Sequence, residues 1–135
     1  MKLYNANRLR TAVLVALVTL FASGNTMASD FHEPFSQERF ETLQAEGAVV
    51  MVEVWASWCS TCRAQVEVLE KLAEEEAFSE IYMLRIDWDE QREKAKALDA
   101  WRQSTLILYK GEHEMARVVA ETREPALRYF LESAL

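Results

Sequence analysis

The stretch that decides the fold is Trp55-Ala56-Ser57-Trp58-Cys59-Ser60-Thr61-Cys62, which contains the only two cysteines of the 135-residue chain. An apolar run over 49–54 precedes it, and a segment with helical spacing of apolar residues follows it. The two thiols are therefore expected at the junction between a strand and the N-terminus of a helix. A helix N-terminus carries unpaired N–H groups and a partial positive charge, and both favour a thiolate over a thiol.

This position gives the two cysteines different expected roles. A lowered thiol pKa makes Cys59 a nucleophile near neutral pH. Cys62 lies within reach to resolve a mixed disulfide that Cys59 has formed. We therefore expect the pair to exchange dithiols and disulfides.

The first 28 residues differ in composition from the rest of the chain. Lys2, Arg8 and Arg10 give a positive start, 12–22 is an apolar run, and a stretch of small residues ends at Ala28. This pattern predicts a secretory signal peptide that is cleaved after Ala28. The alternative is an uncleaved membrane anchor, although the apolar run is shorter than the roughly 20 residues that span a bilayer.

Cleavage would leave a single domain over 29–135, without internal repeats or a Pro/Gly-rich linker. That part of the chain carries 22 acidic and 12 basic residues, a formal net charge of −10. Such an acidic balance argues against nucleic acid or an anionic lipid surface as a partner. Export by the signal peptide would bring the cysteine pair into a compartment where disulfides persist, which the cytoplasm is not. We therefore expect a periplasmic protein, attached to the membrane only if the signal peptide stays uncleaved.

Helical and strand patterns alternate along this domain. The expected helices are 36–46, 59–76, 90–100 and 125–133, and the expected strands are 48–56, 81–86, 105–109 and 115–119. Strands separated by helices pair in parallel, and the last two strands form an antiparallel hairpin. This order predicts an α/β fold with a central mixed sheet of about four strands flanked by helices. On the third helix, Ala95, Leu98 and Trp101 are expected to face inward.

The run from Glu53 to Arg63, Glu-Val-Trp-Ala-Ser-Trp-Cys-Ser-Thr-Cys-Arg, resembles the acid-x-Trp-Ala-x-Trp-Cys-x-x-Cys-basic signature of the thioredoxin-like superfamily. Residues 84–87 resemble the second strand of that family, and 104–112 resemble its third strand and turn. The resemblance covers 31–135. It implies the thioredoxin fold and thiol–disulfide oxidoreductase activity, with no cofactor beyond the redox-active cysteine pair.

The resemblance also implies roles for individual residues. Cys59 would attack, Cys62 would resolve, and Glu53 would be the buried acid beneath Cys62 that takes and returns its proton. The alternative for Glu53 is a strand residue whose carboxylate reaches the surface. The positions implied to contact substrate are Trp58, Ser60, Thr61, Ser104 and Thr105.

The sequence departs from the family at three places. Ser104 stands where the family has a cis proline, and a cis bond before a residue other than proline costs about 2.5–4 kcal/mol. We therefore expect a trans peptide there and an altered backbone edge for substrate. The Ser104 hydroxyl is also expected near the sulfurs, where it either hydrogen-bonds a thiolate or is a neutral loop group. Ala120 replaces a usual glycine, and the first strand of the family is missing or very short.

Three alternative roles for the cysteine pair would involve different chemistry. A structural disulfide over so short a loop would stabilise the fold by only about 2 kcal/mol, against about 3 for a fifteen-residue loop. A zinc or iron–sulfur site needs three or four ligands, and His32 and His113 are the other strong candidates, so it would require a dimer that shares its cysteines. A non-catalytic binding, chaperone or assembly module of thioredoxin shape is the third alternative.

The expected partners follow from the dithiol chemistry. They are protein thiols and disulfides, together with a redox partner protein that resets the pair, and the chain is expected to act as a monomer. Residues 60–61, between the cysteines, include neither proline nor histidine. This favours a reductase or isomerase over a strong oxidant.

Overall fold

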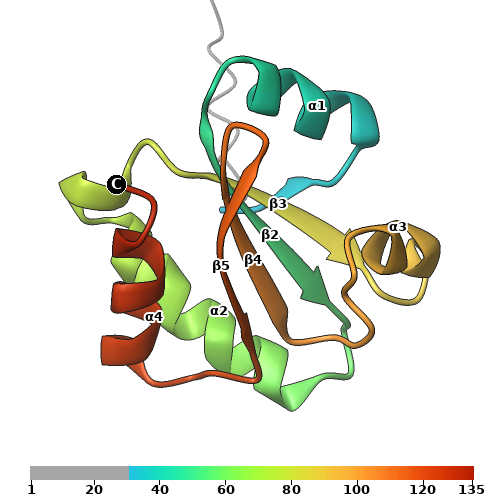
Figure 1. The fold of residues 1–135 in the computed structure, drawn as a ribbon. Helices are drawn as coiled ribbons and strands as arrows, with labels where there is room; N and C mark the ends of the chain where they lie inside the picture. Colours follow the sequence, from blue (N-terminus) through green and yellow to red (C-terminus); the bar gives the residue numbers. More distant parts are fainter. Residues whose placement is uncertain (1–30) are drawn as a thin grey trace, which may run out of the picture.

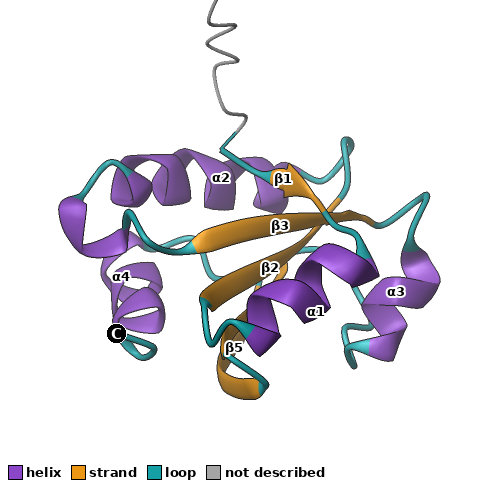
Figure 2. Ribbon diagram, turned by 90° about the horizontal axis from the view of Figure 1, so that it is seen from above, coloured by secondary structure: helices purple, strands orange, loops and turns teal. Residues whose placement is uncertain are grey.

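The computed structural model describes residues 31–135, so the expected signal peptide over 1–28 lies outside the described residues and stays a prediction. A five-stranded sheet forms the centre, and helices pack on both of its faces (Figure 1, Figure 2). The strands are β1 (Glu33–Pro34), β2 (Val49–Trp55), β3 (Tyr82–Asp87), β4 (Thr105–Lys110) and β5 (His113–Val119). The helices are α1 (Gln37–Ala45), α2 (Ser60–Ala73), α3 (Arg92–Ala97) and α4 (Glu124–Glu132), with a 3₁₀ turn at Glu76–Phe78.

The strand order is β1-β3-β2-β4-β5. β1, β3 and β2 run parallel, whereas β4 pairs antiparallel with both β2 and β5. The expected mixed sheet and its C-terminal hairpin are confirmed. The expected number of about four strands was one too low, because the two-residue β1 adds a fifth strand beside β3. A strand that short was expected to be missing or barely present, since two residues show no alternation of apolar and polar side chains.

The two faces of β2 pack against different helices. Val50, Val52 and Val54 lie in one core cluster with side chains from α1 and α3. Met51 lies in a second core cluster, on the opposite face of the sheet, with apolar side chains of α2 and α4. Because successive side chains of a strand point to opposite faces, Glu53 faces the same side as Met51, toward α2. The sheet therefore directs the one acidic residue of β2 toward the helix that carries the cysteines.

The two ends of α1, which lie within one residue of the expected 36–46 helix, are set by a capping serine and a glycine. The Ser36 hydroxyl accepts a hydrogen bond from the Arg39 N–H and caps the first turn. Gly47, with φ +73°, lets the chain turn away after the helix.

The third helix differs from its prediction. It covers only Arg92–Ala97, and the chain leaves it through Asp99, whose φ is +53°. Ala95 is buried as expected, but Trp101 is 67% exposed, so its inward placement was wrong. The helical spacing does not extend as far as residue 101, because the backbone is no longer helical there.

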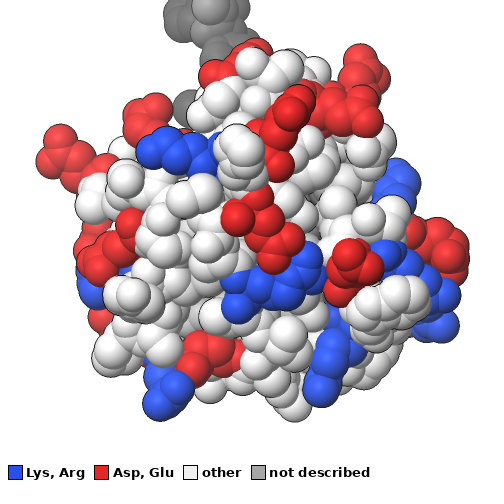
Figure 3. Space-filling view, viewed as in Figure 1, with Lys and Arg blue, Asp and Glu red and all other residues white. Residues whose placement is uncertain are grey.

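The charged side chains seen in Figure 3 intermingle over that face of the molecule, with acidic ones most frequent in its upper half. Among residues 31–135, no helix is both long and apolar enough to cross a bilayer.

Candidate active site

Cys59 and Cys62 form a disulfide at the start of α2. Cys59 is the N-cap residue of this helix, and its Sγ accepts a hydrogen bond from the Cys62 N–H over 3.1 Å. Cys59 retains 6% of its surface, whereas Cys62 is completely buried. The pair packs with Ala56, and Trp55 and Trp88 lie against this small cluster. Of the two cysteines, only Cys59 therefore keeps any exposed surface.

Ser104 lies directly against the disulfide. Its Oγ is 3.1 Å from the Cys59 Sγ and 3.2 Å from the Cys62 Sγ. Because the sulfurs of a disulfide carry no hydrogen, the Ser104 hydroxyl is the donor. Residues 31–135 contain no cis peptide bond, which confirms the expected trans geometry, and Ser104 has φ +61°. A trans peptide with a left-handed residue replaces the family's cis proline here.

The backbone of Ser104 is fully used inside the protein. Its N–H donates to the Val54 carbonyl over 2.8 Å, and its own carbonyl accepts from the Ala120 N–H over 2.8 Å. The Gln65 side chain of α2 donates to the same carbonyl over 3.3 Å. Residue 104 therefore offers neither its N–H nor its C=O to an incoming peptide.

Glu53 is buried, as the resemblance implies. It is 0% exposed, and its Oε2 accepts a hydrogen bond from Arg85 Nε over 2.7 Å. Burial raises the pKa of the Glu53 carboxyl to about 7, and the Arg85 guanidinium opposes part of that rise. A carboxyl that titrates near neutrality is suited to take and return protons.

His32 was considered in the sequence only as a distant metal ligand, yet it adjoins Glu53. Its Nε2 lies 3.0 Å from the Glu53 Oε2, and its Nδ1 lies 2.9 Å from Arg85 Nη2. Burial, with the positive charge of Arg85, lowers the pKa of His32 to about 3. No catalytic or substrate-binding role was expected for His32 or Arg85. The one available signal was strand pairing, because Arg85 on β3 is in direct register with Glu53 on β2.

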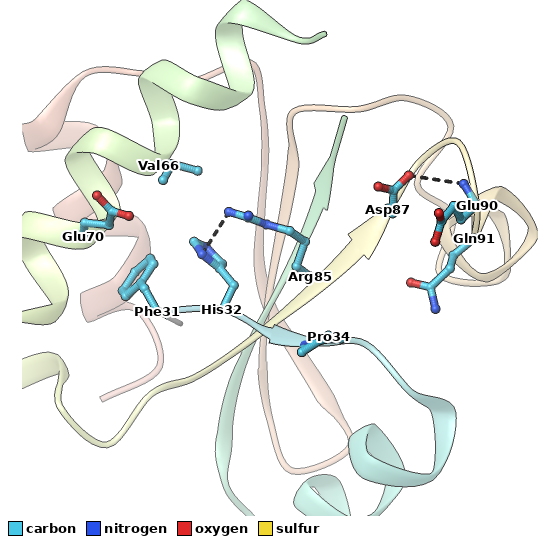
Figure 4. Close-up of a pocket in the computed structure, with 9 residues that line it drawn as sticks. All are labelled: Phe31, His32, Pro34, Val66, Glu70, Arg85, Asp87, Glu90 and Gln91. Carbon is cyan, nitrogen blue, oxygen red and sulfur yellow. Dashed lines mark hydrogen bonds between the residues drawn. The ribbon is translucent and has the colours of Figure 1, made fainter. Parts of the chain in front are cut away.

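A cavity of about 360 Å³ lies beside this cluster, between the β1–β3 edge and α2. Figure 4 shows the Arg85 side chain running from β3 toward His32, with Val66 and Glu70 of α2 opposite. A second cavity of about 270 Å³ also has Arg85 and Val66 in its wall. Arg85 thus reaches both cavities from beside the buried acid.

The remaining predicted contact residues lie at different depths. Trp58 flanks the disulfide, is 57% exposed, and its Nε1–H donates to Asp89 Oδ2 over 2.8 Å. Ser60 is exposed and Thr61 is half-buried. Thr105 is buried, and its hydroxyl donates to the Arg102 carbonyl, so its side chain does not face the surface. Within the described part of the chain, no three His, Cys, Asp or Glu side chains gather as metal ligands do.

The comparisons with known proteins agree with this geometry. The thioredoxin family model matches residues 32–133. Thioredoxin of Chlamydia pneumoniae is 37% identical over 84 residues, which cover 62% of this chain and 79% of the relative. The bifunctional thioredoxin reductase/thioredoxin of Mycobacterium leprae is 28% identical over 88 residues, 65% of this chain and 19% of that protein.

Among solved structures, the crystal structure of Trxlp from Edwardsiella tarda EIB202 superposes with a TM-score of 0.70 at 36% identity, covering 73% of this chain and 95% of that one. The fold, the disulfide at the head of α2 and the matched family model agree. The chain belongs to the thioredoxin family and is a thiol–disulfide oxidoreductase.

Proposed function

We propose that the protein reduces or isomerises disulfides of exported proteins in the periplasm. The observation that carries the proposal is the asymmetry of the two cysteines: Cys59 is the N-cap of α2 and keeps 6% of its surface exposed, whereas Cys62 is completely buried. The leader-like composition of 1–28 supports export, and the absence of proline and histidine at 60–61 supports a reductase or isomerase.

The first step belongs to Cys59. In the reduced protein, its thiolate attacks one sulfur of a substrate disulfide, and the other substrate sulfur leaves as a thiolate that takes a proton from water. Donors already surround the Cys59 sulfur. The Cys62 N–H and the Ser104 hydroxyl both lie within hydrogen-bond distance of it, and both favour its negative charge.

The second step belongs to Cys62. Its thiol gives its proton to Glu53 or to water, the new thiolate attacks the Cys59 sulfur, and the substrate leaves with its second sulfur reduced. Glu53 supports this step because it is buried, faces α2, and has a pKa raised to about 7. The oxidising direction runs the same steps in reverse.

The disulfide left on the enzyme must then be reduced again by a partner. The Mycobacterium leprae relative joins, by its name, a thioredoxin reductase to a thioredoxin. We propose a protein electron donor of comparable chemistry for this chain, which would work as a monomer without an external cofactor.

A Cys62→Ser variant tests the proposal. It retains the attacking sulfur but lacks the resolving one, so mixed disulfides with substrates should accumulate in the cell. We expect the covalent adducts to be recovered by affinity purification without reductant and identified by mass spectrometry. The trapped proteins should be exported ones.

The Cys59→Ser variant is the matched control and should trap nothing. Absence of adducts, together with absence of insulin reduction by the wild-type protein, would contradict the proposed catalytic role. If the Cys59→Ser variant keeps its cellular function, the protein is a binding module instead. Adducts with cytoplasmic proteins alone would contradict the periplasmic location, and metal in a purified anaerobic sample would favour a cysteine-bound site.

A further inference from the structure

Three polar side chains, from β2, β3 and the segment before β1, contact one another in a ring. Arg85 Nε donates to Glu53 Oε2 over 2.7 Å, and Arg85 Nη2 lies 2.9 Å from His32 Nδ1. His32 Nε2 lies 3.0 Å from the same Glu53 oxygen. Glu53 and the His32 side chain are 0% and 5% exposed, whereas Arg85 is 26% exposed. A single cation at the edge of the core thus contacts both buried groups.

The chemistry of Arg85 fixes the tautomer of His32. A guanidinium only donates hydrogen bonds, so the His32 Nδ1 must accept. With its pKa lowered to about 3, the imidazole is neutral over the ordinary pH range. Its one hydrogen is therefore on Nε2, the nitrogen beside Glu53.

That hydrogen has no partner in the disulfide form. Although Nε2 is close to Glu53 Oε2, the geometry is not that of a hydrogen bond, and Glu53 Oε1 is unpaired as well. An unpaired buried donor and an unpaired carboxyl oxygen are both costly. A small rotation of the carboxyl group would pair them, and the gain is greater when the carboxyl group is charged.

We propose that His32 is a positioning residue for the proton transfer at Cys62: its Nε2–H donates to the Glu53 carboxylate when that group is charged and holds it ready to accept the proton. The inference rests on the proposed role of Glu53. In the step itself, the Cys62 thiol loses its proton to Glu53, and the protonated Glu53 later releases it to water.

The surroundings of Glu53 are consistent with this role. The charged or titratable groups that face it are Arg85 from β3, His32 from the segment before β1, and Glu70 from α2. On its β4 side the paired residue is the apolar Leu106. The cavity of about 360 Å³ walled by His32, Arg85 and Glu70 has room for the water that takes the proton away.

The test is a titration of Glu53 in the full chain, followed by ¹³C NMR of its carboxyl carbon. Removing a donor disfavours the charged carboxylate, so His32→Phe should move the midpoint up by about one pH unit. His32→Gln offers an N–H at a similar reach, and we expect it to recover most of the wild-type midpoint. His113→Phe changes the other, exposed histidine and should leave the midpoint where it is.

Kinetics provide the second readout. A mixed disulfide of Cys59 with glutathione is formed, and its resolution by Cys62 is followed by acid quench and mass spectrometry from pH 5 to 9. At a pH below both midpoints, His32→Phe should resolve it about tenfold more slowly than wild type, because about tenfold less Glu53 is ionised. In a Glu53→Gln background, the same substitution should add no further change.

Equal Glu53 midpoints in wild type and His32→Phe would overturn the inference. So would equal shifts in the Phe and Gln variants, since a packing role alone predicts that result. If the wild-type protein exchanges no disulfide while the Glu53 midpoint still moves, the proposed function fails, and the catalytic part of this inference fails with it.

Discussion

Ser104 places a hydrogen-bond donor beside the cysteine pair, at the position where the family has proline. The family's proline has no donor, whereas the Ser104 hydroxyl lies 3.1 and 3.2 Å from the two sulfurs. A hydrogen bond to a charged acceptor is worth more than one to a neutral acceptor. We therefore expect the hydroxyl to stabilise the Cys59 thiolate more than it stabilises the disulfide.

Removal of this hydroxyl should make the protein more reducing. In Ser104→Ala the reduced form loses about 1.4 kcal/mol relative to the disulfide, so the reduction potential should fall by about 30 mV. The pKa of Cys59 should rise for the same reason. Equilibration with glutathione redox buffers, read by tryptophan fluorescence, gives the potential.

Ser57→Ala provides the control, because Ser57 is exposed next to the motif and its side chain makes no hydrogen bond to either sulfur. Its potential should match that of wild type. An unchanged or higher potential in Ser104→Ala would mean that the hydroxyl does not stabilise the thiolate.

Single residues were predictable where a local pattern or a motif defines them. The positions of Cys59 at the N-cap of α2 and of Cys62 in its first turn, the burial of Glu53 and the nearness of Ser104 to the sulfurs were all expected and are confirmed in the geometry. The contact of His32 with Glu53 was not expected from the sequence. It joins residues that are distant in the chain, and it depends on the two-residue strand β1, which directly follows His32.

At the scale of elements, periodic segments were predicted closely and their ends less so. The spacing of buried residues in α2 and the continuous apolar run of β2 specify those elements by themselves. The short α3 ends early, because its last turn is decided by the left-handed Asp99. The left-handed conformation of such a residue depends on tertiary packing, which the spacing of apolar residues in the sequence does not reveal.

The end of β5 also uses a left-handed residue. Ala120 has φ +56° and its N–H pairs with the Ser104 carbonyl, at the position where the family commonly has glycine. A left-handed conformation costs a residue with a Cβ about 1–2 kcal/mol, whereas glycine adopts it freely.

Ala120→Gly should therefore stabilise the protein. Relief of this strain exceeds the entropy that glycine adds to the unfolded chain, and we expect the free energy of unfolding to rise by about 0.5–1 kcal/mol in urea titrations. Ala116→Gly, at a position inside β5 beside its β-bulge, is the matched control and should lower it. A loss of stability in Ala120→Gly would show that the alanine side chain contributes packing that outweighs the strain.

For the molecule as a whole, Glu53 and His32 make opposite contributions to the pH dependence of the free energy of unfolding, and these contributions partly cancel. The pKa of Glu53 is raised from 4.5 to about 7, so the folded state holds its proton longer and stability falls as pH rises between those values. The pKa of His32 is lowered from 6.5 to about 3, so the unfolded state binds an extra proton and stability rises between pH 3 and 6.5. The two effects oppose each other from pH 4.5 to 6.5.

Single substitutions should expose each effect. Relative to wild type, the free energy of unfolding of Glu53→Gln should climb with pH from 4.5 to 6.5, and that of His32→Gln should fall, each by about 1.4 kcal/mol per pH unit at most. Urea denaturation followed by circular dichroism at stepped pH measures both slopes. The remaining carboxyl groups contribute the same background to all three proteins, so slopes that do not diverge would contradict the assignment.

Trp58 has a consequence for the entropy of substrate docking. Its indole stands 57% exposed beside the reactive sulfur, yet its N–H is held by Asp89. Ordering a free side chain on binding costs about 0.5–1.5 kcal/mol, and a side chain already held in place avoids part of that cost. In the proposed reaction, substrates would meet a flat aromatic surface whose orientation is set before the encounter.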